Sequence, residues 1–490
     1  MTTNYLDNYY ARLGVSLDAS QDDIQTAYRR AARQLHPDQN QAPGANELFL
    51  LVQEAYDTLS NPRKRKAYNA SLPEDIDGPP ALMVNTLYSR SAINPDEGRQ
   101  VLYVLLDLMA AQARDQIPQR PPLNLTLVLD TSTSMAGGRL GQVVKAAAQF
   151  IEQLHPHDIV SVVTFNDRAE VLLPASPSED RKRLLTKLSM LQTSGGTEIL
   201  QGLEAGAIEA QRHLRPSYVN HLVLITDGRT YGDEAQCLEL ADRAAEKGLS
   251  ISAIGIGESW NEDFIDALVG QAGGSSVYVD NSSEIHKLLE SRLGKLNQIF
   301  ARNLRMDYQL GPGVDLRYAF RLAPDLGGVM SDSPLYLGAV PLSGSLSVLL
   351  EFEVSPPTGS SQEINIASGQ LHLDIPTRQI PSAHMRFGLS RPLGALPDGE
   401  APPQSLVNAI GKLSLYRMQE DARIELRSGR TEVAAKRMRM LATHLLSAGE
   451  RGLAKTVLMA AEDMQAGKEL DEKSGKQIKY GTRALIHPDE

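Results

Sequence analysis

Five oxygen-bearing side chains from three separate segments have the types and spacing of a metal site. Asp130, Ser132 and Ser134 alternate within one short segment. Thr197 lies in a glycine-rich stretch, and Asp227 follows a third, apolar run. Carboxylate and hydroxyl oxygens suit a hard divalent cation, Mg²⁺ or an ion such as Mn²⁺, in octahedral coordination completed by water. The residues therefore predict a divalent-cation site assembled from three loops.

A second motif, His36-Pro37-Asp38, follows a basic helical segment near the N-terminus. The proline stiffens the turn, while the histidine and aspartate offer polar contacts to a partner. The same tripeptide recurs at residues 487–489 without flanking helices, so the tripeptide alone carries little information. The helices around the N-terminal copy make it a candidate binding loop.

Three arginines precede this loop with helical spacing. Arg29, Arg30 and Arg33 are expected to place positive charge on the solvent side of the helix. Such a face can dock on an acidic patch, with an association rate that falls as salt rises. The segment predicts a binding surface for an acidic protein partner.

The elements that position the metal ligands are short apolar strands alternating with helices. Strands are expected at 123–129, 159–165, 221–226, 249–256 and 276–279, and helices at 140–154, 198–212, 233–247 and 261–271. Nearly continuous apolar strands in this order predict a doubly wound α/β domain with a parallel sheet covered on both faces. Ligand sites in such sheets lie at the carboxyl ends of the strands, where Asp130 and Asp227 are expected.

The segments around the α/β region have other patterns. Residues 300–388 alternate apolar and polar positions between turn residues, which predicts a small antiparallel β domain. Residues 82–88 and 99–108 are also strand-like, and we expect them to pair with the later strands. The α/β domain would then be inserted into a β-sandwich.

The expected organisation has seven parts. They are an N-terminal helical domain at 4–70, a linker at 71–81, the first sandwich strands at 82–118, the α/β domain at 122–296, the rest of the sandwich at 297–388, a linker at 389–403 and a C-terminal helical region at 404–490. Glycines 429, 449 and 467 are expected to end helices of the last region. Its methionines are expected in a helix-bundle core, with an adaptable groove as the alternative.

The predicted ligands, with residues 161–167 and 261–263, resemble the von Willebrand factor A (vWA) domain and its metal-ion-dependent adhesion site. Thr133 stands where the family often has glycine. The resemblance implies that the two serines and Thr197 are close ligands, while the two aspartates bind closely or through water according to state. With few direct negative charges on the metal, a Glu or Asp of a protein partner could complete the site.

The N-terminal helices resemble a J domain over its whole length. The match includes residues 9–15, 28–33 and 54–62 around the His-Pro-Asp loop. The resemblance implies that this loop and the basic helix stimulate ATP hydrolysis by a DnaK-type chaperone. Gln34 and Gln39 stand at positions that are usually basic in the family. Without a Gly/Phe-rich segment or a cysteine-rich region, the chain resembles the third, heterogeneous class of J proteins.

Composition narrows the remaining possibilities. The chain has 490 residues, a net charge of −11 and a single cysteine, Cys237, for which we expect a buried structural thiol. The acidic balance argues against nucleic-acid binding, and residues 1–30 lack the apolar core of a signal peptide. The most apolar stretch, residues 101–113, is too short to cross a bilayer. We expect a cytoplasmic protein that does not insert into membranes.

The motifs favour an adaptor over an enzyme, since no phosphate-binding loop, nucleophile elbow or catalytic-triad spacing is present. The leading hypothesis is a co-chaperone that recruits a DnaK-type chaperone through one domain and an unknown protein through the other. An assembly subunit for a separate ring ATPase of the MoxR or chelatase kind is the first alternative. A non-catalytic scaffold is the second.

Overall fold

The computed structural model of the chain describes residues 9–15, 19–35, 45–69, 82–111, 120–177, 186–230, 232–279, 284–357, 362–378, 381–397, 400–466 and 470–486. The predicted binding loop His36-Pro37-Asp38 and the expected linker at 71–81 lie outside the described residues.

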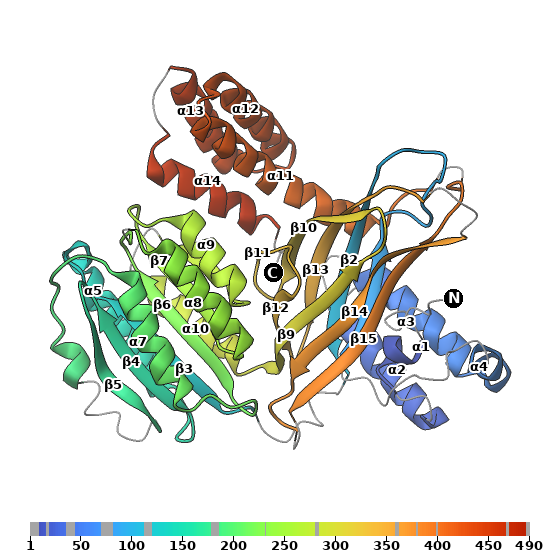
Figure 1. Ribbon diagram of the computed structural model, residues 1–490, viewed down its shortest axis with the longest axis horizontal. Coiled ribbons are helices and arrows are strands. Elements are labelled where there is room, and N and C mark those ends of the chain that lie inside the picture. The colour runs from blue at the N-terminus through green and yellow to red at the C-terminus, as the bar shows by residue number, and fades with distance from the viewer. Residues whose placement is uncertain are drawn as a thin grey trace.

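Four parts can be followed along the chain in Figure 1. The N-terminal helices (blue) lie beside a β-sandwich that contains both early and late strands. The α/β domain (teal to green) lies on the other side of the sandwich, and the C-terminal helices (red) lie above both.

The N-terminal part is a helical hairpin with two short flanking helices. Its helices are α1 (Tyr9–Leu13), α2 (Gln21–Leu35), α3 (Ala45–Leu59) and α4 (Pro62–Asn69). A reciprocal cap begins α2, because the Ser20 N–H donates to Asp23 Oδ2 at 2.8 Å and the Asp23 N–H donates to Ser20 Oγ at 3.1 Å. The apolar faces of α2 and α3 are buried in a common core.

This core continues into the sandwich instead of ending at the domain surface. Gly14, which follows α1, has φ +66°, and a Cβ at its position would lie 2.8 Å from Met83 Cγ and 2.9 Å from Ala111 Cβ. One hydrophobic cluster joins the helical hairpin to Met83, Leu105 and Met109. The N-terminal helices are therefore packed on the outer face of a sheet.

The α/β domain contains a six-stranded sheet in the order β5-β4-β3-β6-β7-β8. Its strands are β3 (Leu123–Asp130), β4 (Ile159–Phe165), β5 (Ala169–Pro177), β6 (Val219–Thr226), β7 (Ser250–Ile256) and β8 (Ser276–Val279). Its helices are α5 (Arg139–Glu152), α7 (Ile199–Gln211), α8 (Glu234–Glu246), α9 (Glu262–Gln271) and α10 (Ile285–Leu296). The five strands expected from the sequence pair in parallel, as predicted. A sixth strand that the sequence analysis did not predict, β5, pairs antiparallel with β4 at one edge.

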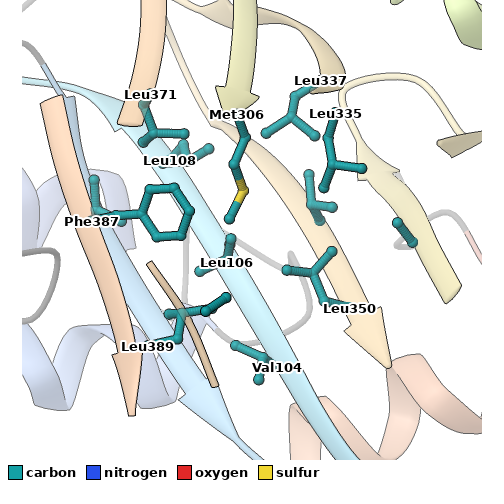
Figure 2. Packing of buried hydrophobic residues seen from close by; sticks show 14 of the residues in the cluster. Val104, Leu106, Leu108, Met306, Leu335, Leu337, Leu350, Leu371, Phe387 and Leu389 are labelled. Carbon is teal, nitrogen blue, oxygen red and sulfur yellow. The ribbon is translucent and has the colours of Figure 1, made fainter. Parts of the chain in front are cut away.

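The β-sandwich has one sheet in the order β1-β2-β13-β10-β11 and a second in the order β12-β9-β14-β15. The strands are β1 (Leu82–Tyr88), β2 (Gln100–Ala110), β9 (Ile299–Leu310), β10 (Val314–Ala323), β11 (Gly327–Val329), β12 (Leu335–Pro341), β13 (Ser345–Val354), β14 (Glu363–Asp374) and β15 (Ser382–Pro392). Figure 2 shows Leu106 of β2, Met306 of β9 and Phe387 of β15 pointing into the shared core.

The α/β domain interrupts this sandwich in the sequence. β2 precedes the domain and pairs along its length with β13, which follows it. The chain leaves through β2 and returns through β9, so the predicted insertion is confirmed. The last strand runs to Pro392, beyond the boundary expected at residue 388.

The C-terminal helices are α11 (Gln404–Arg427), α12 (Thr431–Ser447), α13 (Arg451–Gln465) and α14 (Glu472–Ala484). Gly429 and Gly449 have φ +75° and +87° just after α11 and α12, as expected of glycines that end helices. The methionines divide between environments: Met438 and Met464 are buried, whereas Met440 and Met459 are about half exposed.

Helix α14 docks on α9 of the α/β domain through ion pairs between buried cations and partly buried carboxylates. Lys479 Nζ lies 2.9 Å from Asp263 Oδ1 and 2.8 Å from Asp266 Oδ2, and Arg483 Nη1 lies 3.2 Å from Asp266 Oδ1. Arg423 of α11 also contacts Asp263, at 3.5 Å. We call these five residues the α14 cluster. It places the C-terminal helices against the α/β domain.

No helix within the described part of the chain has both the length and the hydropathy needed to cross a membrane.

Candidate metal centre

The two predicted aspartate ligands come from neighbouring strands. β3 and β6 are paired in parallel, with Leu129 opposite Ile225. Asp130 ends β3 and Asp227 directly follows β6, so the two carboxylates lie at the same edge of the sheet. Both residues are fully buried. This edge is the one at which open α/β sheets bind ligands.

Local hydrogen bonds hold the first carboxylate in place. The Ser132 N–H donates to Asp130 Oδ1 at 2.8 Å, and the Thr226 hydroxyl donates to Asp130 Oδ2 at 2.6 Å. Burial raises the pKa of Asp130, the hydrogen bonds from Ser132 and Thr226 oppose that rise, and the nearby charge of Asp227 adds to it. A bound cation would favour the charged carboxylate.

The serines connect the first carboxylate to the second. The Ser132 and Ser134 hydroxyls lie 2.9 Å apart, and Ser134 Oγ donates to Asp227 Oδ1 at 2.5 Å. Ser132 is buried, whereas Ser134 is exposed. The oxygen atoms therefore run continuously from the buried strand end to the protein surface.

Thr197 reaches the same point from the glycine-rich loop. A Cβ placed on Gly228 would lie 2.6 Å from Thr197 Oγ1, so this hydroxyl is packed directly over the residue that follows Asp227. The loop is held by two backbone hydrogen bonds, from the Thr133 N–H to Gly195 O at 3.1 Å and from the Ser194 N–H to Thr131 O at 2.8 Å. The structure thus brings all five predicted side chains together.

Two further side chains, which the sequence analysis did not predict as site residues, help to build the candidate metal centre. Arg139 Nη1 lies 2.7 Å from Asp227 Oδ2 and donates to Ser134 O at 3.2 Å. Asp167 accepts from the Gly196 N–H at 2.7 Å and so fixes the glycine-rich loop. The only hint of this role in the sequence was the position of Arg139 at the start of the helix that follows the serines. Its contact with Asp227 depends on how that helix packs.

The donor set fits a hard divalent cation. It offers two carboxylates and three hydroxyls, which are the oxygen ligands that Mg²⁺ and Mn²⁺ accept. In the described residues, no group of three or more His, Cys, Asp or Glu side chains is placed to hold a metal ion. Hydroxyl oxygens, rather than a carboxylate or thiolate cluster, distinguish this candidate centre. Arg139 neutralises part of the charge of Asp227, which limits the negative charge that the protein gives to a cation.

The basic face of α2 is only partly as expected. Arg29 and Arg33 are exposed to solvent. Arg30 is half-buried and donates to Leu13 O at 3.4 Å, and burial lowers its pKa. The expectation that Arg30 lies on the solvent side was wrong, because this side chain turns toward the end of α1.

Comparison with known proteins agrees with these parts. The family model of the DnaJ domain matches residues 8–69, and that of the von Willebrand factor type A domain matches residues 124–291. A third model, the Sll0103-like C-terminal alpha-helical domain, matches residues 404–488. The chain thus has an N-terminal J domain, a central vWA-like α/β domain and a C-terminal helical region.

Individual relatives cover different shares of the chain. The uncharacterized protein sll0103 of Synechocystis sp. is 26% identical over 421 residues, covering 81% of this chain and 96% of that protein. The chaperone protein DnaJ of Streptococcus mutans is 54% identical over 70 residues, which is 14% of this chain and only 19% of that chaperone. A solved von Willebrand factor type A structure from Catenulispora acidiphila has a TM-score of 0.62 at 15% identity, covering 81% of this chain and 96% of its own. This last likeness shows the fold alone.

Proposed function

We propose that the protein is a cytoplasmic co-chaperone adaptor. Its J domain stimulates ATP hydrolysis by a DnaK-type chaperone, and its vWA domain binds a protein partner through a divalent cation. The observation that carries the metal half is the continuous set of oxygen atoms from Asp130 to Ser134 at one edge of the sheet. The observation behind the chaperone half is the J-domain match, which includes the His-Pro-Asp loop.

In this proposal Asp130, Ser132, Ser134, Thr197 and Asp227 form a metal-ion-dependent adhesion site that holds Mg²⁺, or another divalent ion such as Mn²⁺. The bound ion would supply a positive charge, and a Glu or Asp of a partner can complete its coordination. Asp130 is fixed by its own hydrogen bonds, so it needs little rearrangement to act as a ligand. Ser134 lies at the exposed end of the site, where a partner carboxylate would approach.

The J domain contributes the chaperone contact through the His36-Pro37-Asp38 loop and the exposed Arg29 and Arg33. Because α1 shares a core with the sandwich, the basic helix would be held at a fixed place relative to the rest of the protein. A partner on the vWA domain would then be presented to the chaperone from a defined direction. The half-buried Arg30 would support the fold of this face more than the contact itself.

The test is single-turnover ATP hydrolysis by the DnaK-type chaperone of the same host. Full-length protein should stimulate hydrolysis, and His36→Gln should abolish the stimulation. His487→Gln alters the second copy of the tripeptide and is the matched control, which should keep full activity. Equal loss in both variants, or no stimulation by the full-length protein, would refute the chaperone half.

The metal half is tested by a magnesium-dependent pull-down with full-length protein and Ser134→Ala. Ser189→Ala changes another exposed serine of the same domain and serves as the control. In the presence of Mg²⁺, the wild-type protein and Ser189→Ala should both capture partners. Capture should be lost when a chelator is added or when Ser134 is replaced by Ala. Capture that does not depend on Mg²⁺ would contradict the proposal. A ring ATPase as the dominant captured partner would favour the assembly-subunit alternative.

A further inference from the structure

A cavity of about 320 Å³ lies between the vWA-like domain and the β-sandwich. It is bordered by the amino-terminal ends of β6 and β7, the last turn of α10 and the end of β10. The candidate metal centre lies at the carboxyl ends of β3 and β6, so the cavity is at the opposite edge of the same sheet. Small-molecule sites occur preferentially at domain interfaces and begin at about this volume.

Positive charge dominates the lining of the cavity. Arg292, Lys295, Arg302 and Arg321 border it, while Asp325 is the carboxylate among the described lining residues. Arg302 is balanced separately by Asp374, outside the lining, at 3.0 Å. The other three cations are left with one carboxylate between them.

The Asp325 carboxylate forms ion pairs with two of these three cations. Arg292 Nη1 lies 2.7 Å from Asp325 Oδ2, and Lys295 Nζ lies 2.6 Å from Asp325 Oδ1. Arg321 reaches only the backbone carbonyl of Asp325, to which its Nε donates at 2.8 Å. Both oxygens of the carboxylate are thus paired, and among the described residues no carboxylate forms an ion pair with Arg321.

Backbone carbonyls hold Arg321 in the wall. Its Nη1 donates to Gly273 O at 3.1 Å and to Leu337 O at 2.9 Å, which joins the two domains. Burial, together with the charges of Arg483 and Arg292, lowers the pKa of Arg321 to about 10, against the opposing effect of Asp325. The guanidinium therefore stays charged near neutral pH, and carbonyl dipoles satisfy its hydrogen bonds without cancelling that charge.

The rest of the cavity is largely apolar and uncharged. Leu296, Ile299 and Pro341 form part of its wall. His221, which also lines it, has Nε2 3.1 Å from Ser252 Oγ, and burial with the charge of Arg292 lowers its pKa to about 3. The imidazole is neutral at physiological pH. The cavity thus combines a cationic end with an apolar wall.

We propose that this interdomain cavity binds a small organic anion. Its carboxylate or phosphate head would lie among Arg292, Lys295 and Arg321, whose three charges share the single carboxylate of Asp325, and its short apolar body would lie against Leu296, Ile299 and Pro341. An anion there would balance charge that is removed from water between the domains, where uncompensated charge is costly. It would contact both domains at once and stabilise them by mass action. The inference does not depend on the metal centre or on the chaperone.

The experiment uses the full chain and isothermal titration calorimetry with three probes. Hexanoate and butyl phosphate carry the two anionic heads, and hexanol is the neutral match of hexanoate. Both anions, or one of them, should bind at millimolar concentration and raise the unfolding temperature, while hexanol should not. The head group that binds more tightly identifies the class of natural ligand.

Two substitutions on helix α10, one beside the cavity and one away from it, separate binding at this site from a general effect of charge. Lys295→Gln should weaken binding of the anion at least about tenfold, since a hydrogen bond to a charged group is lost. Lys287→Gln removes the same charge from an exposed position of the same helix away from the cavity, and should leave affinity unchanged. The proposal is overturned if neither anion binds the wild-type protein, if hexanol binds as tightly as hexanoate, or if the two variants weaken binding equally. Should Lys295→Gln fail to fold, Lys295→Ala removes the same charge, should likewise weaken binding of the anion, and replaces it in the comparison with Lys287→Gln.

Discussion

Removing the charge of Lys479 should release helix α14 from the α/β domain. The side chain is 2% exposed and its Nζ lies within 2.9 Å of carboxylate oxygens of Asp263 and Asp266. Lys479→Met leaves the two partly buried acids with one cation fewer. Breaking a buried pair from one side costs about 3–5 kcal/mol, and we expect the lower end because Arg423 and Arg483 remain.

The single tryptophan of the chain provides the assay. Trp260 is fully buried, its ring centroid lies 6.0 Å from that of Tyr480 on α14, and Lys476 Nζ lies 5.5 Å from its centroid. Undocking of α14 should expose the indole to water and shift its emission to longer wavelength. With about 3 kcal/mol lost and a slope of about 1–3 kcal/mol per molar urea, the midpoint should fall by about 1–3 M.

A matched variant on the same helix supplies the control. Lys473 is 41% exposed and lies 3.8 Å from Glu258, so Lys473→Met should shift the midpoint little, as surface pairs contribute about 0–1 kcal/mol. If Lys479→Met and Lys473→Met have the same Trp260 midpoint, the buried cluster does not hold the helix and the reasoning fails.

Three further outcomes are expected. Gly228→Ala should displace Thr197 and abolish the rise in unfolding temperature that Mg²⁺ gives. Gly141→Ala, whose Cβ would meet nothing within 4 Å, should keep that rise. A rise with Mg²⁺ in both variants would count against the metal centre. Gly14→Ala should cost about 1–2 kcal/mol for its left-handed backbone alone and loosen the J domain, seen as faster amide exchange at Met83, and unchanged exchange would argue against the shared core. Burial raises the pKa values of the two α9 aspartates in the α14 cluster, but the neighbouring cations lower them more, so both pKa values lie below the usual one. The stabilisation that these carboxylates give is therefore present above their unfolded pKa of about 4 and is lost as the pH falls further. Trp260 emission should shift to longer wavelength over that acidic range, and an emission that stays constant there would contradict the assignment.

Much of the α/β domain could be predicted because its signals are local. Apolar runs end at Asp130 and Asp227, and the parallel pairing of β3 with β6 brings their ends together without further information. The spacing of Ser132 and Ser134 then follows from one short loop. Thr197 was predictable as a candidate ligand only as a member of a pattern, since its position depends on contact with Gly228.

Other features had weak local signals or none. Strand β5 is half exposed and lies at the sheet edge, so its sequence lacks the continuous apolar run of the central strands. Arg30 has the same helical spacing as its neighbours, yet its guanidinium turns to Leu13 O because α1 lies beside it. Neither outcome can be read from residues near in sequence.

The amino-acid sequence by itself determined the order of domains, the strand ends that carry the candidate ligands and the insertion of one domain in another, because apolar periodicity and short motifs act over a few residues. The tertiary structure alone decided which of these parts share a core. The contact of Gly14 with Met83, the ion pairs of Lys479 and the cation-lined cavity around Asp325 each join segments far apart in the chain. Their energies come from burial and charge between surfaces that only the folded chain brings together.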